Sequence, residues 1–239
     1  MRTITRVVVA VAATLVLAAA PVIVASPAAA ASASYKLNYA KQPNSKQILL
    51  RWNPCRVHTY KVNLAAVPAR YRSVVLAETR AAVRTMAAKT GMSWNYEGQT
   101  NGVPRAGNAA TQRVDVVIAY TTPAKTNYPL YGSTVGYGGA SLLGNWRPAG
   151  GNNYTTAITK GYLVIDVPQM LRDLRPGFGA GASRGNLLLH ELGHVAGLGH
   201  TNSGLMNNRL NWRSPKGYAA GDLAGLAKVG RKAGCLAGF

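Results

Sequence analysis

Acidic residues are scarce in this 239-residue chain, which has 7 Asp and Glu against 27 Lys and Arg. The basic residues are scattered rather than gathered in a long run, and no basic motif interleaved with aromatic residues favours nucleic acid. Scattered charge is typical of a solvated surface. The alternative is attraction to polyanions, such as acidic substrates or cell-envelope polymers. The sequence therefore predicts no specific nucleic-acid partner.

A long apolar run stands at the N-terminus. Two arginines in residues 1–6 precede the apolar run 7–20, and the small-residue stretch "SPAAAASAS" follows. This order is typical of a secretory signal peptide, with cleavage expected after Ala31. An uncleaved membrane anchor is the alternative, but Pro21 and the small residues argue against it. We expect a secreted chain without stable membrane insertion; 27 basic residues less Arg2 and Arg6 leave 25 against 7 acidic, a net charge of +18.

The rest of the chain shows no internal repeat and no domain linker. Residues 32–46 are small, polar and Pro-containing, which favours a flexible leader, and residues 47–239 are expected to form one domain. Helical periodicity covers residues 68–91 and 182–196, and a final helix follows near Asp222, which is placed to cap it. Strand patterns occur in "KQILLRW", "VHTYKVNL", "SWNYEG", "RVDVVIAYTT", "GSTVGYGGASLLG" and "YTTAITKGYLVIDV". This order predicts an α+β fold with a mixed sheet.

Histidine is also rare, yet three of the four histidines lie within "HELGHVAGLGH". On a helix, His190 and His194 share one face about 6 Å apart and can hold one zinc ion. His200 would lie roughly 9 Å further along a continuous helix and off that face, so the helix has to end before it. Gly197 and Gly199 stand where this break is needed, because glycine takes a positive φ without a Cβ penalty.

Three imidazoles leave the fourth tetrahedral position to water, which is typical of a catalytic zinc site. Zinc lowers the pKa of its water to about 7. Glu191, next to the first ligand, is the candidate general base. His58, alone in a strand pattern, is interpreted as structural.

The same residues carry a family resemblance. "HELGHVAGLGH" matches the long zinc signature of the metzincin metalloproteases, and "SGLMNN" places Met206 like their Met-turn methionine. Within this clan, the pattern HELGH-x-x-GL-x-H most resembles the motif of the matrixins and of the matrixin-like secreted proteases of bacteria. The flanking segments "RWNPCRVHTYKVN" and "GDLAGLAKVG" support the resemblance to the bacterial proteases.

The resemblance implies a twisted, mixed five-stranded sheet with three helices and an active-site cleft over one catalytic Zn²⁺. It assigns His190, His194 and His200 as ligands, Glu191 as general base and Met206 as the apolar floor. An edge strand, for which residues 133–141 are the candidate, would hold a peptide by β-augmentation.

The chain also departs from the family. Asn208 stands where some metzincins carry an extra tyrosine ligand, so a tyrosine-assisted mechanism is not expected. Seven scattered carboxylates and the lone His58 argue against the calcium and second zinc sites of vertebrate matrixins.

Cys55 and Cys235 are the only cysteines. An even count in a secreted chain favours a disulfide between them. In the alternative, Cys55 would be a latency ligand for the metal and Cys235 would be free. Little more than twenty residues separate the expected cleavage site from Cys55, too few for a folded prosegment, so we predict the disulfide.

The sequence therefore predicts a secreted, zinc-dependent endopeptidase that acts as a monomer on protein or peptide substrates. Two alternatives remain at this point: a basic envelope- or polyanion-binding protein with a vestigial zinc site, and a zinc hydrolase of a non-protein amide. Glu191 favours an enzyme, because a structural zinc site has no need of a base beside it.

Overall fold

The computed structural model describes residues 34–151 and 153–239. The expected signal peptide, residues 1–31, lies outside this part of the chain. None of the helices within the described ranges has the length and apolar character needed to cross a membrane.

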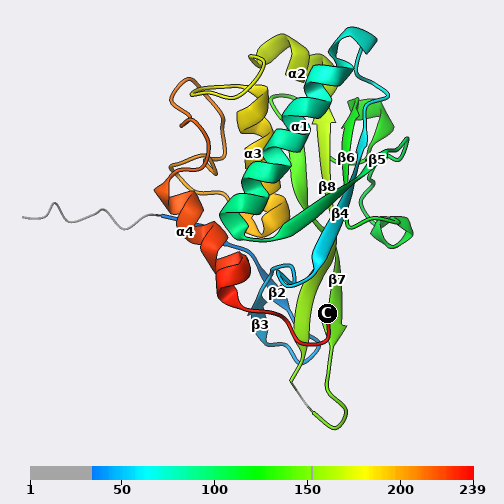
Figure 1. The fold of residues 1–239 in the computed structure, drawn as a ribbon, viewed down its shortest axis with the longest axis vertical. Coiled ribbons are helices and arrows are strands. Elements are labelled where there is room, and N and C mark those ends of the chain that lie inside the picture. The colour runs from blue at the N-terminus through cyan, green and yellow to red at the C-terminus, as the bar shows by residue number, and fades with distance from the viewer. Residues whose placement is uncertain (1–33, 152) are drawn as a thin grey trace, which may run out of the picture. The chain divides into compact units, whose positions relative to one another are not determined.

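A five-stranded mixed sheet is the centre of the fold, in the order β5-β4-β6-β8-β7 (Figure 1). Strands β5, β4, β6 and β8 are parallel, and β7 runs antiparallel to β8 along one edge. The predicted α+β class with a mixed sheet is thus confirmed. The bounds are β4 Val57–Asn63, β5 Ser93–Gln99, β6 Val116–Thr121, β7 Gly136–Trp146 and β8 Thr155–Asp166.

Helices α1 and α3 pack against each other over one face of the sheet (Figure 1). The resemblance implied three helices, but the described residues form four: α1 Ala69–Thr90, α2 Val167–Asp173, α3 Arg184–Ala196 and α4 Ala220–Val229. The unpredicted α2 has only seven residues, too few to show helical periodicity in the sequence. Single 3₁₀ turns cover Ala109–Thr111, Pro123–Lys125 and Arg231–Ala233.

Strand β6 is buried on both faces, which explains its continuous apolar run. Val116, Ile118 and Tyr120 pack into the main core beneath α1 and α3. Val117 and Ala119 alternate with them and join a second cluster on the other face.

The segment expected to be a flexible leader, residues 32–46, contains two paired strands in its described part. Strand β1 (Lys36–Leu37) pairs with β9 (Leu198–Gly199), and β2 (Tyr39–Lys41) pairs with β3 (Gln47–Leu49). The side chain of Asn38 also donates to the carbonyl of Leu198 at 3.1 Å. The partners of β1 lie about 160 residues away, so local composition could not reveal this order.

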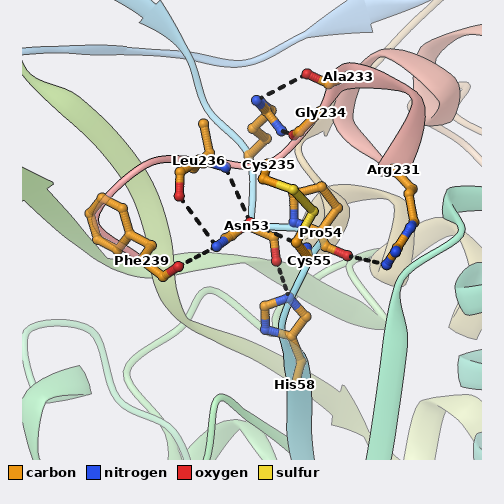
Figure 2. The surroundings of a disulfide bond; sticks show 11 residues. Asn53, Pro54, Cys55, His58, Arg231, Ala233, Gly234, Cys235, Leu236 and Phe239 are labelled. Carbon is orange, nitrogen blue, oxygen red and sulfur yellow. Dashed lines mark hydrogen bonds between the residues drawn. A yellow bond between two sulfur atoms is a disulfide. The ribbon is translucent and has the colours of Figure 1, made fainter.

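The predicted disulfide between Cys55 and Cys235 is confirmed. The alternative, in which Cys55 is a latency ligand for the metal and Cys235 is free, is therefore wrong. The disulfide joins residues 180 positions apart in the sequence. Closing a loop of this length stabilises the folded protein by up to ~4–5 kcal/mol in the chain-entropy model. Asn53 reinforces this junction, since its side chain donates to carbonyls of Leu236 and Phe239 and accepts from the Leu236 amide (Figure 2). The C-terminal segment is thereby tied to the loop before β4.

A buried carboxylate, Asp115, joins the start of β6 to β4. It accepts hydrogen bonds from Arg56 Nη2 at 2.6 Å and from the Thr59 amide at 3.0 Å. Burial alone would raise its pKa, but the nearby His58 ring, hydrogen bonds from Arg56 and Thr59 and the charge of Arg56 outweigh burial and lower the pKa from 3.8 to about 2.

We expect Asp115→Asn to lower the free energy of unfolding by about 2 kcal/mol at pH 7. Because the folded pKa of Asp115 is depressed, its contribution is complete above pH 3.8 and is lost as the pH falls through about 2. Urea unfolding of the wild type and of Asp115→Asn at pH 7, 4 and 2 measures the difference in their free energies of unfolding. A difference that stays constant over that range would contradict the assignment to ionised Asp115.

Candidate metal centre

Helix α3 carries the first two histidines of the motif and is almost wholly buried. It begins after Ser183, whose Oγ accepts a hydrogen bond from the Asn186 amide at 3.2 Å. It ends at Gly197, which has φ +115° and whose amide donates to the carbonyl of His194 at 3.1 Å. The helix break that the sequence required at Gly197 is present.

After Gly197 the chain turns back toward the helix through β9. Strand β1 pairs with it, and the Asn38 amide donates to the carbonyl of Gly197 at 3.0 Å. His200 directly follows β9 and is therefore held opposite α3. The segment first interpreted as a leader thus positions the third histidine.

The three imidazoles meet at their Nε2 atoms. His194 Nε2 lies 3.2 Å from that of His190 and 3.0 Å from that of His200, and the remaining pair is 3.2 Å apart. Tetrahedral zinc with Zn–N bonds near 2.0–2.1 Å would separate two ligand nitrogens by about 3.3 Å. These histidines therefore lie close enough to bind one metal ion, and the spacing fits zinc.

Backbone carbonyls set the tautomers of two ligands. His190 Nδ1 donates to the Leu205 carbonyl at 2.7 Å, and His194 Nδ1 donates to the Leu198 carbonyl at 2.8 Å. A carbonyl can only accept, so the proton sits on Nδ1 and the lone pair of each Nε2 faces the centre.

Burial keeps these rings neutral. It lowers the pKa of His190 to about 3 and that of His194 to about 4, and it lowers the pKa of His200. Neutral imidazole is the form that binds a metal ion, so the ligand set is ready at neutral pH.

Glu191 lies beside the histidines in the same cavity and is 5% exposed. Burial raises its pKa to about 8, and a backbone hydrogen bond from Gly138 opposes that rise. Glycine is required at 138, because a Cβ atom there would lie 2.6 Å from the Glu191 carbonyl oxygen. Edge strand β7 can therefore approach α3 closely enough to contact the candidate base.

The cavity has a volume of about 590 Å³ and lies between β7 and α3. Residues 133–140, almost all of the expected edge segment, line one side, and Leu187 of α3 lines the other. The loop after Met206 supplies Asn208, Arg209 and Leu210. An extended chain lying in this cavity would run beside the sheet edge.

Met206 is 1% exposed and packs against α3 at Gly193. A Cβ atom at Gly193, one residue before His194, would overlap Sδ of Met206. The loop that carries Met206 is closed by the Thr201 amide, which donates to the Met206 carbonyl at 2.9 Å. Met206 is therefore a buried side chain packed against the helix that carries His190 and His194.

Sequence reasoning assigned Asp222 only a capping role. Its carboxylate does accept from the Ala219 amide at 2.8 Å, at the start of α4. It also accepts from the amides of Leu205 at 2.7 Å and Met206 at 3.2 Å. Asp222 is the only acidic residue after Glu191, and this isolation in the sequence was the one available signal.

His58 does not join the metal centre. It is fully buried between the rings of Trp52 and Trp94, with ring centroids 4.9 and 4.8 Å away. Its Nε2 lies 3.0 Å from the Asn53 carbonyl oxygen. The contacts of His58 are those of a core residue.

No protein-family model matches the chain, and no curated protein matches it at a significant level. A functional assignment therefore depends on the motif and on the geometry described above.

Proposed function

We propose that this chain is a secreted zinc endopeptidase of the metzincin type, with a matrixin-like motif. One observation carries the proposal: the buried carboxyl of Glu191 shares a cavity with three histidine Nε2 atoms that lie 3.0–3.2 Å apart. The three neutral imidazoles fit zinc, and the disulfide fits an oxidising compartment.

Zinc bound here would supply a Lewis acid that polarises a carbonyl group and makes water acidic. Glu191 would take a proton from the attacking water as its oxygen bonds to the scissile carbonyl carbon. The same carboxyl would then give that proton to the amine nitrogen as the C–N bond breaks. Burial of Glu191 raises its pKa, which makes the ionised carboxylate a stronger base toward the water proton.

Strand β7 provides the surface along which a peptide substrate would bind. It is the edge of the sheet, so one side of its backbone has no strand partner among the described residues. An extended substrate would add to this edge by backbone hydrogen bonds, next to Glu191.

Cleavage of a denatured protein substrate with a quenched fluorophore tests the proposal. We expect the purified chain to hold one zinc ion, measured by elemental analysis, and to cleave the substrate. A chelator should abolish cleavage, and added zinc should restore it. A fully zinc-loaded, folded chain that cleaves no protein would overturn the proposal, and a non-protein amide would become the next substrate to assay.

A further inference from the structure

A second cavity, with a volume of about 450 Å³, lies at the sheet edge opposite the metal centre. Strand β5 forms this edge, whereas the metal centre lies beside β7. The walls come from α1, β4 and β5, and none of their residues contributes to the metal cavity. Any ligand bound here would be separate from the cleft of the proposed protease.

Two arginines of α1 provide its positive charge. Arg80 and Arg84 are four residues apart, so they lie on the same face of the helix about 6 Å from each other. Both are exposed, and neither forms an ion pair within the described residues. Like charges at this spacing repel each other, so a bound anion would relieve an unfavourable contact.

The only acidic residue at this cavity does not neutralise them. Tyr96 faces Arg80, whose guanidinium carbon lies 5.1 Å from the Tyr96 ring centroid. Glu97 lines the same cavity but forms no ion pair with either arginine within the described residues.

The floor of the cavity holds polar groups suited to an anion. Tyr60 is 4% exposed; burial raises the pKa of its hydroxyl, and the positive charges of Arg80 and Arg84 oppose that rise. The Nε1–H of Trp94 is buried and has no hydrogen-bond acceptor. A buried donor without an acceptor is rare in folded proteins.

We propose that this cavity binds a phosphate group between the guanidinium groups of Arg80 and Arg84. Arginine pairs with tetrahedral oxyanions through two parallel hydrogen bonds, and two guanidiniums match a phosphate charge near −2. The cavity is larger than one phosphate, which leaves room for the neighbouring units of a phosphate-bearing chain. The excess of basic residues over the whole chain would favour the approach of such a polyanion.

Calorimetric titration at 0.15 M salt tests the proposal with two probes, inorganic phosphate and a linear polyphosphate. The test variant is Arg80→Gln/Arg84→Gln. The control is Arg113→Gln/Lys125→Gln, which removes the same charge at two exposed residues outside this cavity. Circular dichroism and the melting temperature establish that each variant is folded.

We expect the test variant to bind polyphosphate at least 10-fold more weakly than the wild type and the control to stay within about 2-fold. If the wild type binds inorganic phosphate as tightly as it binds polyphosphate, the cavity recognises a single phosphate group. If the wild type binds only polyphosphate, the cavity recognises the polymer. Equal losses in both variants would show diffuse charge attraction and overturn the proposal. Wild-type affinity in the test variant, or no binding of either probe to the wild type, would also overturn it.

Discussion

Glu191→Gln is expected to lower kcat/KM for a protein substrate by at least about 10²-fold while the chain still holds zinc. Glutamine keeps the size of the side chain but cannot accept the proton of the attacking water. The substitution should not change the orientation of His190 and His194, because their Nδ1 atoms donate to backbone carbonyls and not to Glu191. The acceptors are the carbonyls of Leu205 and Leu198. Activity and bound zinc should be measured on the same sample.

Glu97→Gln is the matched control for this experiment. Glu97 is exposed, lies on β5 at the opposite sheet edge and contributes nothing to the metal cavity. The Glu97→Gln variant should therefore cleave the substrate as fast as the wild type does. A zinc-loaded Glu191→Gln protein that retains more than about a tenth of wild-type activity would show that another group removes the proton.

The local parts of the centre could be predicted from the sequence. The spacing of His190 and His194 requires a shared helical face, and the position of His200 requires a helix end near Gly197. Both requirements involve residues within eleven positions of each other. The structure places α3, the Gly197 cap and the three rings as this reasoning demands.

The parts that depend on distant pairing could not be predicted. Strand β1 pairs with β9, and its own sequence is only the two residues Lys36–Leu37. Gly138 is needed because α3 approaches β7 there, a contact between segments about fifty residues apart. Such contacts leave no periodic pattern, so composition alone made residues 32–46 look flexible.

Asp222 is the strongest case of a long-range contact that affects the metal centre. Its carboxylate binds the Leu205 and Met206 amides, and the carbonyl of the same Leu205 residue accepts the Nδ1 proton of His190. The side chain is 1% exposed, so water cannot replace it. We therefore expect Asp222 to be a positioning residue that acts on His190 through the backbone of the loop that carries Met206.

Asp222→Ala should consequently lower both stability and zinc affinity. It leaves three backbone amides without an acceptor, those of Leu205, Met206 and Ala219, and we expect a loss of about 3–5 kcal/mol in the free energy of unfolding. Loss of the group that orients His190 should weaken zinc binding by about 10–100-fold. Asp222→Asn keeps one acceptor oxygen, so its stability and zinc affinity should lie between those of the wild type and Asp222→Ala.

Asp173→Ala is the control, because Asp173 is exposed and its ion pair with the neighbouring Arg172 lies at the surface. Its stability should change by less than about 1 kcal/mol. Zinc affinity is the decisive measurement, since a role in folding alone would not change it in the folded fraction. If folded Asp222→Ala protein binds zinc as tightly as the wild type, Leu205 does not carry the effect of Asp222 to His190, and the carboxylate stabilises the loop without orienting the ligand.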